Sequence, residues 1–124
     1  MNETWLDLAR DNRNSANELI QKDHFRSSAT RAYFAVYSKI SYEIERSGLS
    51  LPAGLEGPSH SKLRPTIEKN LTHLGKENKR VALSQIVGRL YDLRVYADYR
   101  PSITFRGHEA REALSLMKKA FEAF

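Results

Sequence analysis

The chain has 124 residues, of which 40% are hydrophobic and 28% are charged, values typical of one globular domain over residues 1–124 and too apolar for a disordered segment. The absence of cysteine excludes disulfides, a thiol nucleophile and cysteine-ligated zinc. No apolar run approaches the ~20 residues that cross a bilayer, and the first residues do not resemble a signal peptide, so we expect a cytoplasmic protein without a membrane segment.

Apolar residues at three- and four-residue steps predict two helices in the first third of the chain. The first covers about residues 3–22 and the second about residues 23–47. The second has the clearer apolar face, which consists of Phe25, Ala29, Ala32, Tyr33, Val36, Ile40 and Ile44. We expect Asp23 to cap this helix or to occupy its first turn, and Gly48 to end it.

Residues 48–58 contain three glycines and two prolines and predict a loop, which we expect to be the most mobile element. A third helix is predicted over residues 59–74, where Pro65 should cause a kink or a new start and should push Arg64 toward extended geometry. A fourth helix covers residues 77–99, and a fifth follows Thr104, its expected N-cap. Five amphipathic helices with short connections favour an all-α, up-and-down helical bundle, a fold that does not by itself define a function.

Positive charge is concentrated in residues 60–106. This segment holds ten lysines or arginines and four acids, a difference of +6, whereas the whole chain carries +5. A local basic excess fits an anionic partner such as RNA, a nucleotide or an acidic protein. It fits equally well a charged surface that keeps a small domain soluble.

Several kinds of catalytic site have no counterpart in the sequence. The four histidines, at positions 24, 60, 73 and 108, lack the spacing of metal-binding helix motifs. There is also no glycine-rich phosphate loop and no nucleophile elbow of a serine hydrolase. We therefore expect no metal and no cofactor.

Two groups of residues remain as candidate sites. The first lies at the end of the fourth helix and comprises Arg89, Arg94, Asp98, Tyr99 and Arg100. An aspartate at a helix C-terminus opposes the helix dipole, so Asp98 needs a cationic or hydrogen-bonding partner. Asp98 can pair with Arg94, four residues before it. It could also lock the packing by accepting from an arginine of another helix, such as Arg31. Alternatively, the arginines could clamp a phosphate while tyrosines stack on bases.

The second group is the run from Ser59 to Arg64, directly after the predicted loop. His60, at a helix N-terminus and near basic side chains, could bind a phosphate or act as a general base. The alternative is a capping or surface histidine. The aromatic run from Tyr33 to Tyr37 is interpreted as core.

The order of these motifs resembles the small HEPN domains of prokaryotes over nearly the whole chain. The resemblance rests on the run Arg31-x-Tyr33-Phe34-Ala35-x-Tyr37, on His60 followed by Ser61-Lys62-Leu63, on Leu90, Arg94, Ala97, Asp98 and Tyr99, and on an alanine-rich last helix over residues 107–124.

This resemblance implies an all-α bundle that dimerises and works in toxin–antitoxin or defence systems, often beside a nucleotidyltransferase-like protein. Many members are metal-independent ribonucleases in which an arginine is followed by a histidine five to seven residues later. No arginine in this chain has a histidine at that spacing.

Three hypotheses follow, and they leave open whether the protein is an enzyme. The first is a HEPN-like homodimer that acts as a non-catalytic partner module for RNA or a nucleotide. Its binding residues would be Arg31, Arg64, Arg89, Asp98, Tyr99 and Arg100. The second is a metal-independent ribonuclease toxin with a rebuilt site, in which His60 is the base and Arg94 or Arg64 holds the phosphate. The third is a purely structural dimerisation module with Asp98 in a packing lock.

Overall fold

The computed structural model describes residues 4–49 and 58–124. These residues contain no strand and form five α-helices and one short 3-10 helix: α1 Trp5–Gln21, α2 Phe25–Arg46, α3 His60–Lys69, η1 Thr72–Leu74, α4 Glu77–Tyr99 and α5 Gly107–Glu122. The all-α helical fold predicted from the periodicity is confirmed. Most of the predicted loop over residues 48–58 lies outside the described residues, so its expected mobility stays a prediction. Within the described ranges, no helix is both long and apolar enough to cross a membrane.

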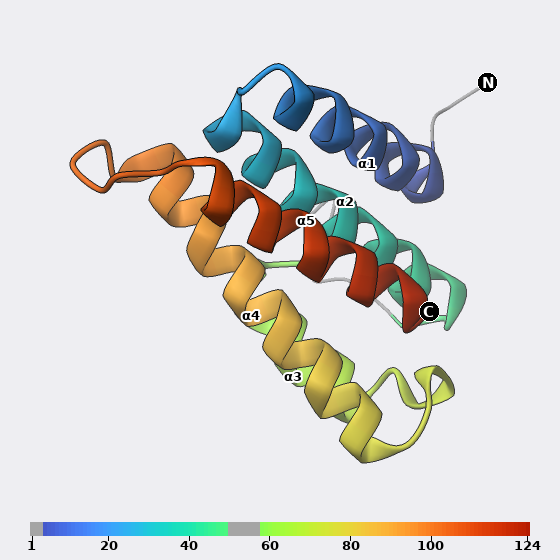
Figure 1. Cartoon of the computed structure of the whole chain (residues 1–124). Helices are drawn as coiled ribbons and strands as arrows, with labels where there is room; N and C mark the ends of the chain where they lie inside the picture. The colour runs from blue at the N-terminus through green and yellow to red at the C-terminus, as the bar shows by residue number, and fades with distance from the viewer. Residues whose placement is uncertain (1–3, 50–57) are drawn as a thin grey trace.

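α2 is the central helix of the bundle (Figure 1). It packs against α1, α4 and α5, whereas α3 packs mainly on α4. Figure 1 shows α1 and α2 running antiparallel, with α5 along α2 and α4 at an angle to both. α2 packs on α4, and the Tyr37 hydroxyl of α2 donates to the Pro58 carbonyl, just before α3 begins.

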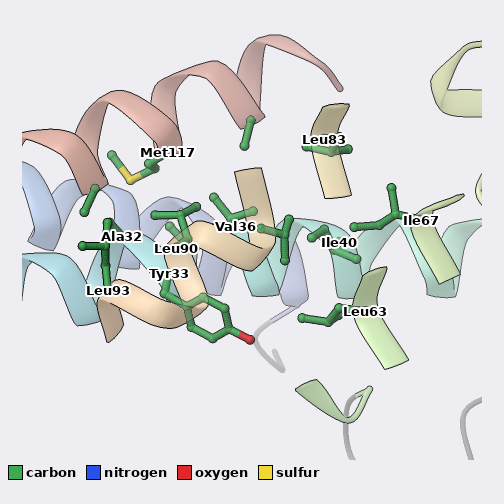
Figure 2. Packing of buried hydrophobic residues seen from close by; sticks show 14 of the residues in the cluster. Ala32, Tyr33, Val36, Ile40, Leu63, Ile67, Leu83, Leu90, Leu93 and Met117 are labelled. Carbon is green, nitrogen blue, oxygen red and sulfur yellow. The ribbon is translucent and has the colours of Figure 1, made fainter. Parts of the chain in front are cut away.

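The core gathers side chains from α2, α3, α4 and α5 (Figure 2). Ala29, Ala32 and Ala35 on α2 are fully buried, and their small size lets the neighbouring helices approach closely. Tyr33 is only 1% exposed, but its hydroxyl lies at the edge of the cluster in Figure 2. The ring is therefore a core residue, while the hydroxyl is available to a polar partner.

The turn between α1 and α2 differs from the prediction that Asp23 caps α2. Asp23 instead has a positive φ of 61°, and its N–H donates to the Ile20 carbonyl while the His24 N–H donates to the Leu19 carbonyl. This pair of bonds is the Schellman arrangement that ends a helix, and aspartate tolerates the left-handed conformation better than most residues. Asp23 thus closes α1, and His24 is the N-cap of α2.

Three other predictions about the helices are also wrong. α3 ends at Lys69 rather than at residue 74, and the separate 3-10 helix η1 follows it. α3 continues through Pro65, with Arg64 inside the helix. The hydrogen bond that proline removes would have reached the carbonyl of Ser61, which is an exposed residue whose carbonyl water can solvate. The N-cap of α5 is Arg106 rather than Thr104, and the Arg106 N–H donates to the Glu109 carboxylate at 2.8 Å. The sequence favoured threonine on intrinsic preference, but the glutamate three residues further on fixed the start.

Candidate functional site

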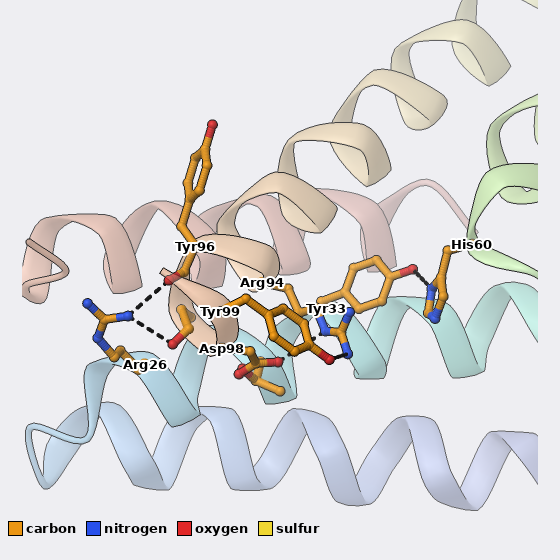
Figure 3. A network of polar contacts seen from close by, with 9 residues as sticks. Arg26, Tyr33, His60, Arg94, Tyr96, Asp98 and Tyr99 are labelled. Atoms are coloured by element: carbon orange, nitrogen blue, oxygen red, sulfur yellow. Dashed lines mark hydrogen bonds and ion pairs between the residues drawn. The ribbon is translucent and has the colours of Figure 1, made fainter. Parts of the chain in front are cut away.

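A hydrogen bond between Tyr33 and His60 joins the core to the surface. His60 is the first residue of α3, and its Nδ1 lies 2.5 Å from the Tyr33 hydroxyl oxygen. Figure 3 shows the two side chains pointing toward one another from α2 and α3. This contact holds the start of α3 against the middle of α2.

Aromatic rings surround His60 on several sides. Its ring centroid lies 5.3 Å from that of Tyr37, 5.5 Å from Tyr33 and 5.6 Å from Tyr91. The Phe34 ring follows at 6.2 Å. These contacts orient the imidazole while leaving part of it accessible to solvent.

The environment favours the neutral form of His60. Burial and the nearby positive charge of Arg94 lower the pKa of the His60 imidazole. Burial also raises the pKa of the Tyr33 phenol, which therefore keeps its proton. A neutral imidazole carries a proton on only one of its two ring nitrogens. The hydrogen bond made by one nitrogen determines which of the two is protonated.

The position of that proton follows from the hydrogen bonds of Tyr33. Within residues 4–49 and 58–124, the Tyr33 hydroxyl has no acceptor besides His60 Nδ1. With the phenol as donor, Nδ1 accepts, and the proton of neutral His60 lies on Nε2. In this tautomer, His60 presents a hydrogen-bond donor at Nε2.

Arg94 lies on the same side of the bundle as His60. Its guanidinium carbon is 5.3 Å from the centroid of the Phe34 ring, which also contacts the His60 ring. The other ring against it is Tyr99, again at 5.3 Å. Phe34 therefore connects the two residues that the sequence named as catalytic candidates.

Asp98 has both a cationic and a hydrogen-bonding partner. Its Oδ2 lies 3.1 Å from Arg94 Nε, and its Oδ1 accepts a bond from the Thr30 hydroxyl at 2.5 Å. The suggested partner Arg31 is wrong, because Arg31 donates to Asn12 and lies over the Phe34 ring instead. Asp98 is thus held by its own helix and by α2.

Arg26 completes the end of α4. Its guanidinium donates to the carbonyls of Tyr96 and Ala97, both at 2.9 Å, as the dashed lines in Figure 3 show. Further bonds reach the carbonyls of Arg100 and Ile103. A cation at a helix C-terminus offsets the partial negative charge there, so Arg26 stabilises the turn that carries Asp98 and Tyr99.

A pocket of about 530 Å³ lies between α3 and α4, beside His60. We call it the α3–α4 pocket. Its lining is Tyr33, His60, Ser61, Leu63, Arg64, Gln85, Val87, Gly88, Arg89, Tyr91 and Asp92. A volume of this size is within the range of ~300–1,000 Å³ typical of small-ligand sites.

The remaining predicted binding residues differ in whether they line the α3–α4 pocket and whether their charge is already paired. Arg64 lines the α3–α4 pocket. Arg89 reaches the pocket edge, but its guanidinium forms two hydrogen bonds with the Glu112 carboxylate, at 2.8 and 3.0 Å. Tyr99 is 63% exposed, and Arg100 follows it at the end of α4 as an exposed residue outside this pocket. The structure therefore brings Arg64 and His60 together and ties Arg89 to α5.

The described residues contain no cluster of three or more histidine, aspartate or glutamate side chains that could hold a metal ion. Comparison with known sequences gives one family over almost the entire length, because the HEPN domain matches residues 2–124. The chain belongs to the HEPN domain family. A UPF0332 protein of Thermotoga maritima is 24% identical over 110 residues, which are 89% of this chain and 77% of that protein. No solved structure gives a significant match.

Several residues of the candidate site in this HEPN domain were not identified from the sequence. Tyr33 and Tyr37 were interpreted as core, which is correct for the Tyr33 ring but omits its hydroxyl. Gln85, Gly88 and Asp92 were not singled out, although their spacing of three and four residues places them on one face of α4. That spacing, read together with the basic run on α3, is the signal that could have identified the pocket.

Proposed function

We propose that this HEPN domain binds RNA or a nucleotide and serves as a partner module in a toxin–antitoxin or defence system. The observation that carries the proposal is the convergence of His60, Arg94 and the α3–α4 pocket on one side of the bundle. A phosphate placed there would meet a hydrogen-bond donor at His60 Nε2 and the positive charge of Arg64. Exposed faces of Tyr91 and Tyr99 offer surfaces on which bases can stack.

Net charge supports the same proposal. The basic excess of residues 60–106 lies on α3, α4 and the segments that flank them. Only part of this charge is used internally: Arg80 donates to backbone carbonyls, Arg89 pairs with Glu112 and Arg94 pairs with Asp98. Lys62 and Arg64 have no ion-pair partner within 4.0 Å in the described part of the chain, so they can contact an anionic ligand.

A second candidate function is metal-independent RNA cleavage. It is favoured by the lowered pKa of His60 beside the permanent cation of Arg94, a combination suited to proton transfer near a phosphate. The tautomer argues against His60 as the initial base, because the basic nitrogen Nδ1 already accepts from Tyr33. His60 Nε2–H is instead suited to donating a hydrogen bond. Binding without cleavage is therefore the first choice.

One experiment separates the two functions. Purified protein is incubated with a mixed RNA pool in EDTA, and RNA binding is measured in parallel at rising salt. We expect intact RNA and an affinity that falls as salt rises, because bound phosphates release counterions. His60→Ala and Arg64→Ala should weaken binding. His108→Ala and Arg10→Ala, which change exposed residues of the same type outside the pocket, should not.

Cleavage in EDTA that disappears in both His60→Ala and Arg94→Ala would replace the binding function with the ribonuclease. Absence of both cleavage and binding would remove both candidates and leave a structural role for the Arg94–Asp98 pair. Melting temperatures of all variants show whether a loss of binding reflects a loss of fold.

HEPN domains commonly dimerise, and we extend this property to the present chain as a proposal. A nucleotidyltransferase-like protein is the partner that the family resemblance suggests. Light scattering after gel filtration measures the first of these proposals directly. A mass of one chain at micromolar concentration would contradict the homodimer.

A further inference from the structure

One face of α4 forms a wall of the α3–α4 pocket. Gln85, Gly88 and Asp92 all line the pocket, and their spacing puts them on the same side of the helix over about two turns. Gly88 lies in the middle, where a side chain would reduce the space: a Cβ there would lie 3.1 Å from an Arg64 guanidinium nitrogen. The missing side chain lets Arg64 lie against α4.

Two charged side chains of the pocket, the Arg64 guanidinium and the Asp92 carboxylate, are available to a ligand. Within the described ranges, neither Arg64 nor Asp92 has an ion-pair partner within 4.0 Å, whereas Arg89 is paired with Glu112. A carboxylate only accepts hydrogen bonds, and a guanidinium only donates them. A ligand that carries an anionic group and, apart from it, a pair of hydrogen-bond donors would satisfy both.

Among the common nucleobases, guanine has the matching edge. Its N1–H and exocyclic N2–H₂ are adjacent donors, and a carboxylate can accept from both at once. Adenine presents an acceptor at N1 beside its amino group, cytosine presents an acceptor at N3 beside its amino group, and uracil flanks its single N–H with two carbonyls. A carboxylate facing any of these three edges would leave at least one acceptor opposed to an acceptor.

We propose that the α3–α4 pocket recognises a guanine nucleotide, free or within RNA, through Asp92. Tyr91, a residue that is 37% exposed, supplies a ring for stacking, and Arg64 supplies the charge for the phosphate. Gln85 lies two turns away from Asp92 on the same face and has a donor and an acceptor for the rest of the ligand. This inference rests on the proposed RNA- or nucleotide-binding function and gives it a base preference.

The test is calorimetric titration of the full chain with GMP, AMP, CMP and UMP at one ionic strength. A parallel titration uses six-residue oligoadenylate with and without a single internal guanosine. We expect GMP and the guanosine-containing oligonucleotide to bind roughly 5- to 150-fold more tightly than their competitors, the discrimination given by one bidentate contact with a base.

Asp92→Asn is the decisive variant. Its amide offers one acceptor and one donor, which matches the N1 and amino group of adenine and mismatches the adjacent N1–H and N2–H₂ donors of guanine. The ratio of GMP to AMP affinity should therefore fall to one or below. Removal of a negative charge strengthens phosphate binding for every nucleotide alike, so the ratio isolates the contact with the base. Asp11→Asn, the same change at an exposed position of α1, should keep the wild-type ratio.

The outcomes distinguish this inference from the function on which it rests. RNA binding without a preference for guanine overturns the base assignment and leaves the binding function intact. A guanine preference that survives Asp92→Asn overturns the role of Asp92. If neither mononucleotides nor oligonucleotides bind, both the inference and the proposed function are wrong.

Discussion

Tyr33 shows how one residue can belong to the core and to the site at the same time. Its ring is almost fully buried, and its hydroxyl contacts His60. The hydrogen bond favours the neutral imidazole, because it is donated to a nitrogen that must be unprotonated to accept it. Tyr33 is thus a positioning residue that sets both the orientation of His60 and the place of its proton.

Tyr33→Phe tests this role. The change removes one oxygen and keeps the ring, so the core should remain packed. Without the donor at Nδ1, the neutral imidazole loses part of its stabilisation, and the pKa of His60 should rise relative to that of the wild type. NMR titration of the His60 ring protons and nitrogens measures both the pKa and the tautomer.

Tyr37→Phe is the matched control. The Tyr37 ring is also near His60, at 5.3 Å between centroids, but its hydroxyl donates to the Pro58 carbonyl. This variant should leave the His60 tautomer unchanged. An equal pKa change in the two variants would mean that aromatic packing, rather than the Tyr33 hydrogen bond, controls His60.

The sequence could predict that the Tyr33 ring is buried, because its position fits the apolar repeat of α2. It could not predict that the hydroxyl emerges beside His60. Periodicity identifies the face of a helix, whereas the direction of a polar atom at the tip of a long side chain depends on which helix packs over it. The partners of Asp98 illustrate the same limit: the i,i+4 spacing predicts the pair with Arg94 inside α4, but the bond from the Thr30 hydroxyl depends on the packing of α4 on α2.

At the scale of an element, α4 combines structural and binding roles on different faces. Leu83, Leu90 and Leu93 are buried, while Gly88 and Asp92 line the α3–α4 pocket. A glycine inside a helix lowers stability relative to alanine by about 0.5–1 kcal/mol. Its presence at position 88 is consistent with the space that Arg64 occupies.

Gly88→Ala should therefore separate stability from binding. The new methyl group would press on the Arg64 side chain, which is exposed and flexible enough to move. The free energy of unfolding should increase by up to about 1 kcal/mol, as measured by urea denaturation. The affinity for RNA should decrease, because Arg64 leaves its place over α4.

A double-mutant cycle with Arg64→Ala provides the control. If Gly88→Ala weakens binding by displacing Arg64, then it should have no further effect on RNA affinity in the Arg64→Ala background. An additive loss would show that the methyl group blocks the ligand directly.

Helix ends were the least predictable part of the elements. α4 was predicted with the bounds that the structure shows, because its apolar pattern, Gly75 before it and Pro101 after it act together. The start of α2 was missed because Asp23 can cap one helix or end another, and the hydrogen bonds of the turn decide between the two. The residue preferences for helix ends thus predicted a boundary correctly only where no neighbouring residue offered a competing hydrogen bond.

At the scale of the whole molecule, α2 connects two parts of the bundle. It packs on α1 and α5 on one side and on α4 on another, and α3 joins the bundle mainly through α4. Near the C-terminal end of α2, Glu43 adds a polar link to the segment between α3 and α4: its carboxylate lies 2.8 Å from His73 Nε2 and 3.3 Å from Lys39 Nζ. The Glu43 side chain is only 4% exposed, so its carboxylate is shielded from solvent, whereas the His73 side chain is 42% exposed.

This link should make the stability of the fold depend on pH in a defined direction. Burial alone would raise the pKa of Glu43, but hydrogen bonds from His73 and Lys39 outweigh it and hold the pKa below its ordinary value. A carboxylate with a lowered folded-state pKa stabilises the fold above its unfolded pKa, and this stabilisation is lost as pH falls through the folded value. The free energy of unfolding should therefore decrease below about pH 4.3, the ordinary pKa of glutamate.

Glu43→Gln should remove this contribution and flatten the dependence. At pH 7 the variant should be less stable by about 1–3 kcal/mol, the cost of leaving charged hydrogen-bonding groups without their partner. At pH 3 the difference from the wild type should shrink, because the wild-type carboxyl is then increasingly protonated. Urea denaturation at the two pH values measures both quantities.

Glu45→Gln, at an exposed position two residues away, should change stability little at either pH. An equal destabilisation by Glu43→Gln at pH 7 and pH 3 would mean that Glu43 acts through packing, because charge would then contribute nothing to the link between α2 and the segment that carries His73.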